Sequence, residues 1–174
     1  SYSINPVLFD SVFTVTVDTL NNIKEKVGYF SFYTFASTYN TSGQPTVTKT
    51  ELDKLFSKFR SSGIKHLIVD LRYNGGGSTT TAEYLDSAIA PSSAANNIMY
   101  SYLYNDKLMN NLSGAQLESS VKFPSQTGGL MLNNVFFITS RNTASASELT
   151  LNNLKPYMNV KLIGDSTYGK PVGF

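Results

Sequence analysis

Three short, mainly apolar runs constrain the fold of this chain more than any other feature of its sequence. They are residues 66–71, 135–138 and 160–163. The first two are typical of buried parallel strands, and the third predicts a further strand. A turn and a helical pattern follow the first run at Thr79–Ile89 and the second at Ser145–Leu154. Repeated strand–turn–helix units predict an α/β fold with a central, mostly parallel sheet.

The N-terminal third predicts two strands and a helix. Val12–Val17 alternates β-branched residues, and Val27–Phe35 is rich in aromatic ones. A helix is expected from Thr48 or shortly after, because Thr48 and Glu51 have the spacing of a capping box and Gly63 stands where a helix would end. The apolar stripe of that helix is Leu52, Leu55, Phe56 and Phe59.

The middle of the chain is less regular. Ile98–Tyr104 predicts a further strand, and it is followed by residues 105–129, which are polar and weakly patterned. This composition fits either an insertion or a lid.

The composition excludes several classes of function. The 174 residues make one domain or most of one, and a formal net charge of +2 gives no basic surface for nucleic acid or acidic membranes. Every apolar stretch falls short of the ~20 residues that a membrane-spanning helix needs. The chain has no cysteine and a single histidine, His66, which heads a predicted buried strand and is expected to be structural. The chain therefore has few of the residues that a Ser–His–Asp or a Cys–His catalytic site needs.

Ser145 has two interpretations. Ser145 and Glu148 have capping-box spacing, so the serine could simply cap the following helix. Alternatively, a serine between a buried strand and a helix start is exposed as a nucleophile. Its oxyanion would face backbone N–H groups, first that of Ala146, and the positive end of the helix dipole. The local sequence leaves both interpretations open.

The turn Gly75–Gly77 follows the first apolar run. It fits a flexible turn or an anion-binding nest, but it lacks both the P-loop ending and the GxGxxG spacing. Because both turns follow central strands, they should lie along one sheet edge, where a glycine amide would be a second oxyanion donor beside Ala146. Asp70 and Arg72 are expected to form an ion pair that braces this turn.

Lys170 is the candidate general base. It lies in a segment with no regular pattern, where a lysine is most often solvated. To accept the hydroxyl proton of Ser145, its ammonium must first lose a proton, which requires a dry pocket. The residues expected around it are Thr167 and Glu148 as polar partners and Tyr168 and Phe174 as apolar walls.

Three separate segments resemble motifs of the carboxyl-terminal processing, or tail-specific, serine proteases. Asp70–Gly77 (DLRYNGGG) is similar to their DLRxNxGG element, and Thr143–Glu148 (TASASE) to their SASASE nucleophile segment. Gly164–Lys170 (GDSTYGK) is similar to the GxxTxGK segment that carries their base. The order of the segments and the spacing from Ser145 to Lys170 also match, and the resemblance covers about residues 27–170.

The resemblance implies roles for individual residues. Ser145, rather than Ser147, would be the nucleophile, and Lys170 would be the general base. The implied oxyanion-hole amides are those of Gly76 and Ala146, and the implied supporting residues are Glu148 and Thr167.

The resemblance also implies a fold and a setting. The fold would be the crotonase-like, ClpP-like β-β-α superhelical core, which acts without a metal or cofactor. Substrates would be proteins with apolar, flexible C-termini, cleaved in the bacterial periplasm or cell envelope. Residues 1–26 are expected to be a lead-in segment, too short for the PDZ domain of many relatives, which would lie upstream if present. Residues 27–174 would be a catalytic core that is cut short at its C-terminal end.

Two positions depart from the family pattern. Phe174 replaces a glutamine that often helps to hold the lysine, and Pro156 replaces an aspartate found in some relatives. The departure at Phe174 supports an alternative function, a non-catalytic module that binds peptides or lipophilic ligands. A third candidate is an acyl-CoA hydratase or isomerase, although no pair of catalytic carboxylates stands out. The favoured prediction is a serine endopeptidase with a Ser–Lys dyad.

Overall fold

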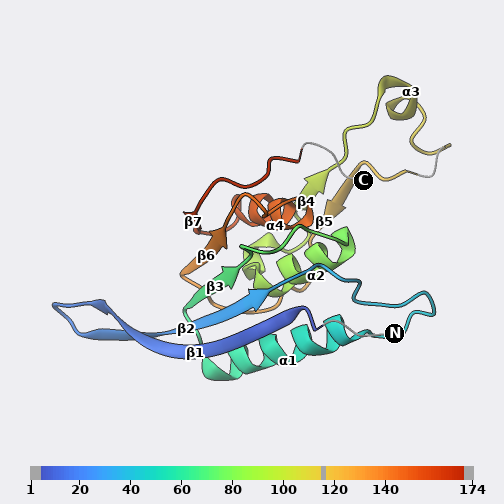
Figure 1. The fold of residues 1–174 in the computed structure, drawn as a ribbon. Coiled ribbons are helices and arrows are strands. Elements are labelled where there is room, and N and C mark those ends of the chain that lie inside the picture. Colours follow the sequence, from blue (N-terminus) through green and yellow to red (C-terminus); the bar gives the residue numbers. More distant parts are fainter. Residues whose placement is uncertain (1–4, 115–116, 171–174) are drawn as a thin grey trace.

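The computed structural model describes residues 5–114 and 117–170 (Figure 1). The strands are β1 Val7–Asp18, β2 Ile23–Phe32, β3 His66–Asp70, β4 Ile98–Ser101, β5 Ser120–Lys122, β6 Asn134–Thr139 and β7 Val160–Gly164. The helices are α1 Val47–Ser62, α2 Thr79–Ile89, α3 Asp106–Met109 and α4 Ala146–Leu154, with a short 3₁₀ helix at Ser92–Ala94.

The main sheet has five strands in the order β1-β2-β3-β6-β7. β1 is antiparallel to β2, whereas β2, β3, β6 and β7 are all parallel. The α/β class and the mostly parallel sheet are thus confirmed, in agreement with the crotonase-like core. Asp70 pairs with Ile138, so β3 and β6 end side by side at one edge of the sheet. The turns that carry the candidate site follow these two ends.

The core fills one face of the sheet. Phe30 of β2 contacts Phe56 and Phe59 of α1 through its ring, and α2 and α4 add buried side chains to the same core. Tyr29, Ile68 and Phe136 occupy one register row on the other face, where they are only half-buried. Helices α1, α2 and α4 therefore pack against one face of the main sheet.

Most predicted elements are confirmed. α2 has the predicted bounds, and Gly63 ends α1 in the left-handed conformation at φ 63°. The predicted capping box at Thr48 is wrong, because Thr46 is the N-cap residue and Thr48 is buried within the first turn. The predicted strand 98–104 ends at Ser101, where its pairing with β5 stops.

Residues 105–129 lie largely outside the main sheet. In their described part they form α3 and β5, and β5 pairs only with β4 in a separate two-stranded sheet. Figure 1 shows α3 projecting away from the main sheet. This placement fits an insertion, and its role as a lid stays a prediction.

Within residues 5–114 and 117–170, no helix is both long and apolar enough to cross a membrane.

Candidate active site

The turn between β6 and α4 holds Ser145 in an unusual backbone conformation. Its φ is 58° and its ψ is −118°. In the described part of the chain, the other non-glycine residues with positive φ are Asn22 and Asn96, and asparagine tolerates this region far better than serine. Ser145 is half-buried, so its side chain remains accessible at the edge of the sheet.

Ser145 and Ser147 have different environments. Ser147 is completely buried, and its hydroxyl donates a hydrogen bond of 3.0 Å to the carbonyl of Asn74. Ser147 therefore links the start of α4 to Asn74, the residue before the glycine turn. The predicted capping box is formed between Ser145 and Glu148, with the Ser145 N–H donating to Glu148 Oε2 at 2.8 Å. A capping hydroxyl that accepts a hydrogen bond can still donate its own proton.

The glycine turn packs directly on the nucleophile turn. A Cβ atom at Gly76 would lie 2.7 Å from the carbonyl oxygen of Ala144, 2.8 Å from Ser145 Cβ and 2.9 Å from the nitrogen of Ala146. Gly76 also has a φ of 100°. Only glycine fits this position, and the predicted meeting of the two turns at one sheet edge is found.

Asn74 connects the two turns. Its side chain is fully buried, donates to the carbonyl of Phe32 at 2.9 Å and accepts the N–H of Gly76 at 2.9 Å. Its carbonyl accepts from the N–H of Ala144 and the hydroxyl of Ser147. The amide of Gly76 is thus already engaged, which was not anticipated for an oxyanion donor.

Thr143 makes a second connection. Its buried hydroxyl donates to the carbonyl of Leu71 at 2.8 Å and accepts the N–H of Ser140. Asn74 and Thr143 were missed as positioning residues, although both lie inside the motifs that carry the family resemblance. Two short polar side chains beside buried strands were the available signal.

The carboxylate of Glu148 joins the serine and lysine segments. Glu148 Oε2 accepts the N–H of Ser145 at 2.8 Å and the N–H of Lys170 at 3.1 Å. Glu148 Oε1 accepts the N–H of Gly169 at 2.6 Å. Burial favours a higher pKa for Glu148, but hydrogen bonds from the hydroxyl of Thr167 and from these amides outweigh it and lower the pKa. Glu148 of α4 and Thr167 of the lysine segment are therefore partners of each other.

The segment that carries Lys170 is fixed at two further points. The N–H of Tyr168 donates to the carbonyl of Thr143 at 2.9 Å, and the hydroxyl of Thr139 donates to the carbonyl of Asp165 at 2.8 Å. The side chain of Lys170 is half-buried. Tyr168 is 71% exposed, so the prediction that it walls the lysine is wrong, and Phe174 lies outside the described residues.

The predicted brace of Asp70 and Arg72 is confirmed. The guanidinium of Arg72 binds both carboxylate oxygens of Asp70, with the shortest contact at 2.6 Å, and the hydroxyl of Tyr29 also donates to this carboxylate. Burial favours a higher pKa for Asp70, but the hydrogen bonds from Arg72 prevail and lower the pKa. This pair fixes the chain just before the glycine turn.

The opposite end of β3 from the glycine turn carries His66. Its ring interacts with Glu25 and Asn134, which fits the predicted structural role. Across the described residues, no group of three or more His, Cys, Asp or Glu side chains is arranged to hold a metal ion.

The sequence profile of Peptidase family S41 matches residues 26–173. The chain belongs to this family. The match includes both turns and the lysine segment, and it confirms the resemblance to the carboxyl-terminal processing proteases. Among proteins of curated function, none shows significant similarity to this S41 chain.

Solved structures share the fold of this S41 chain. A protein from Bacteroides fragilis NCTC 9343, assigned to the S41 proteases, superposes with a TM-score of 0.80 and 29% identity over 99% of this chain and 41% of its own. The photosystem II D1 C-terminal processing protease superposes with a TM-score of 0.62 and 20% identity over 97% of this chain and 38% of its own. A lipoprotein from Streptococcus agalactiae superposes with a TM-score of 0.52 and 17% identity over 91% of this chain and 50% of its own. The last two likenesses show the fold alone, and this chain spans about two fifths of the first two structures.

Proposed function

We propose that this S41 chain is the catalytic core of a serine endopeptidase, with Ser145 as nucleophile and Lys170 as general base. Lys170 would take the hydroxyl proton as Ser145 attacks a peptide carbonyl, giving a tetrahedral intermediate and then an acyl-enzyme. The protonated lysine would return its proton to the leaving amine. Water, deprotonated by the same lysine, would then release the acyl group.

One observation carries the proposal: the positive φ of Ser145. A residue that only caps a helix normally has an extended backbone, and Ser145 has φ 58° and ψ −118° instead. Such a conformation costs about 1–3 kcal/mol and persists where the surroundings enforce it, most often at active sites. The sharp strand–turn–helix geometry resembles the strained turn that exposes the nucleophile in other serine hydrolases.

Glu148 supports the pairing of Ser145 with Lys170. Since one carboxylate oxygen accepts an N–H from each residue, their backbone nitrogens are no farther apart than the sum of those two hydrogen bonds. A half-buried lysine at this position can direct its ammonium toward the serine hydroxyl. We infer that Glu148 positions the dyad through the main chain, with Thr167 holding Glu148 in turn.

The oxyanion would be stabilised at the start of α4. The amide of Ala146 is the first proposed donor, since it begins the helix and lies beside Ser145. Gly76 is the second proposed donor. The N–H of Gly76 already donates to Asn74 Oδ1, so when the oxyanion forms this N–H would either be shared between the two oxygens or leave Asn74 for the oxyanion.

The substrates are proposed to be proteins with apolar, flexible C-termini, cut outside the cytoplasm of a bacterium. The D1 C-terminal processing protease supports the C-terminal preference by its name, and the lipoprotein supports a location at the cell envelope. Residues 27–174 would form the catalytic core, with a PDZ domain upstream as a proposed partner domain. β1 joins the same sheet, so the described part of residues 1–26 contributes an edge strand.

The test compares the wild-type chain with Ser145→Ala and Lys170→Ala on an unfolded protein that has an apolar C-terminus, with products identified by intact-mass spectrometry. Circular dichroism verifies that each variant is folded. Cleavage by the wild type alone supports the dyad. Cleavage by Lys170→Ala would exclude lysine as the base, and binding without cleavage by any form would favour the non-catalytic module.

A further inference from the structure

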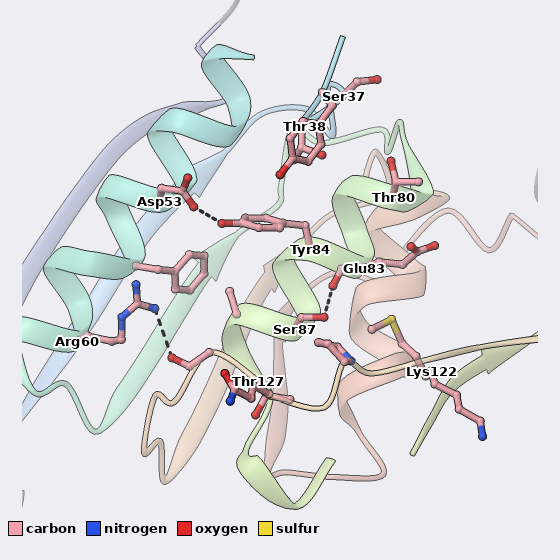
Figure 2. Close-up of a pocket in the computed structure, with 17 residues that line it drawn as sticks. Ser37, Thr38, Asp53, Arg60, Thr80, Glu83, Tyr84, Ser87, Lys122 and Thr127 are labelled. Carbon is pink, nitrogen blue, oxygen red and sulfur yellow. Dashed lines mark hydrogen bonds between the residues drawn. The ribbon is translucent and has the colours of Figure 1, made fainter. Parts of the chain in front are cut away.

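A large cleft lies away from the candidate dyad. Its volume is about 910 Å³, within the range of ligand sites, and it lies between α1 and α2 under the segment 122–128 (Figure 2). Figure 2 shows Asp53 and Arg60 of α1 on one side, and Glu83 and Ser87 of α2 on the other.

One end of the cleft lies next to the glycine turn. Thr80 lines this end and stands in the first turn of α2, directly after the glycine turn. Ser37 lines the same end, just after Phe35, whose backbone pairs with Gly77. A polypeptide that crosses the glycine turn at Ser145 could therefore continue into the cleft without leaving the surface.

The charged walls of the cleft are balanced. The lining carries two acidic side chains, Asp53 and Glu83, and two basic ones, Arg60 and Lys122, so it has no net charge. Asp53 is paired with Lys49 at 2.6 Å and also accepts from Tyr84, while Arg60 donates to the carbonyl of Gly128 at 3.3 Å. The contact between Tyr84 and Asp53 spans the cleft from α2 to α1, and together these contacts hold the side chains in place. They favour an uncharged ligand over a nucleotide, a phosphate or a metal ion.

The cleft is lined by both apolar side chains and hydroxyl groups. Phe56 and Met99 are almost fully buried and Ala88 is half-buried, whereas Ser87 and Thr80 contribute hydroxyl groups. The extent along α2 from Thr80 to Ala88 is about 12 Å at the helical rise of ~1.5 Å per residue. An extended peptide covers this length in about four residues at ~3.3 Å each.

We infer that this cleft is an accessory substrate subsite that binds about four residues of an extended, uncharged polypeptide segment at a distance from the scissile bond. The inference rests on the proposed peptidase function for its substrate class. Apolar side chains of the bound segment would contact Phe56 and Met99, while its backbone would hydrogen-bond to the hydroxyl groups that line the cleft. Such a subsite would select unfolded chains, because only these can enter a narrow cleft in extended form.

The experiment blocks the cleft with Ser87→Trp and uses Ser57→Trp as the matched control. Ser57 is exposed on α1 and does not line the cleft. For Ser87→Trp, we expect the ratio of kcat/KM on an unfolded, alkylated protein to kcat/KM on a peptide of about four residues to fall at least ~tenfold, mainly through KM. Ser57→Trp should leave this ratio at the wild-type value. An unchanged ratio for a folded Ser87→Trp variant would overturn the inference, and Thr80→Trp at the end next to the glycine turn provides a second blocking variant.

Binding to a Ser145→Ala background separates this inference from the proposed function. The probe is a fluorescent peptide of about 12 residues made of Ala, Ser and Val, followed by anisotropy. Binding that Ser87→Trp weakens at least ~tenfold supports the subsite, even if the wild type cleaves nothing. If both blocking variants, Ser87→Trp and Thr80→Trp, leave binding unchanged, or if the peptide does not bind at all, the inference is rejected.

Discussion

Replacing Asp86 by asparagine tests the most strongly buried carboxyl group of the described structure. Asp86 lies on α2 with no exposed surface, and its Oδ2 accepts a hydrogen bond of 2.7 Å from Asn153 of α4. Its Oδ1 has no hydrogen-bond partner of normal geometry, although the Thr150 side chain is close enough to affect this carboxyl group. Burial raises the pKa of Asp86 from 3.8 to about 7, with Asn153 and Thr150 partly opposing the shift and the charge of Glu83 adding to it.

The magnitude follows from this shift. Between its pKa in the unfolded chain and about pH 7, Asp86 keeps a proton in the folded protein that the unfolded chain releases. The folded state binds more protons, so the free energy of unfolding falls as pH rises through this window and levels off above it. A shift of roughly three pH units corresponds to about 4 kcal/mol. The amide introduced by Asp86→Asn cannot titrate, so the variant lacks this decline.

The assay is urea unfolding of wild type and Asp86→Asn from about pH 4 to pH 8, followed by circular dichroism. We expect similar stability at the acidic end and a variant more stable by up to about 4 kcal/mol at pH 8. Asp106→Asn, at an exposed aspartate of α3, is the control and should run parallel to the wild type. A constant difference between wild type and Asp86→Asn across the whole range would refute the reasoning.

Three further substitutions test the candidate site. Ser145→Gly should be more stable than Ser145→Ala by roughly 1 kcal/mol in urea unfolding, because glycine relieves the positive φ, and both should lose peptidase activity; equal stability would mean that the turn is unstrained. Gly76→Ala should cost at least ~2 kcal/mol and abolish cleavage, since its Cβ would press on the turn of Ser145, whereas Gly75→Ala, with open space around its Cβ, should be tolerated in both assays. Glu148→Gln should lower kcat roughly 100-fold in a folded protein, because an amide has one acceptor oxygen for three backbone donors. Activity near the wild-type level would show that Glu148 does not position Ser145 and Lys170.

The order of the elements was readable from the sequence because each depends on local patterns. The apolar stripe of α1 and the buried runs of β3 and β6 predicted their elements to within a few residues. The two turns could be placed at one edge, since parallel strands bring their carboxyl ends together. Local propensity explains why these predictions succeeded.

The connections between the turns could not be predicted in the same way. The bonds of Asn74 to Phe32 and Gly76 depend on side-chain orientation across distant segments. The backbone of Ser145 was equally hidden, because tertiary contacts force it against the preference of serine. Capping and catalysis share one spacing in the sequence, and that spacing does not reveal the backbone conformation of Ser145.

Covalent labelling of Ser145 tests the central claim most directly. The wild type, Lys170→Ala and Ser147→Ala would each be treated with a fluorophosphonate, and the adduct located by peptide mass spectrometry. We expect one adduct on Ser145 in the wild type and in folded Ser147→Ala, and a rate at least ~100-fold lower in Lys170→Ala. Labelling of Ser145 that is equally fast without Lys170, or an adduct on another serine, would contradict a strained serine activated by that lysine.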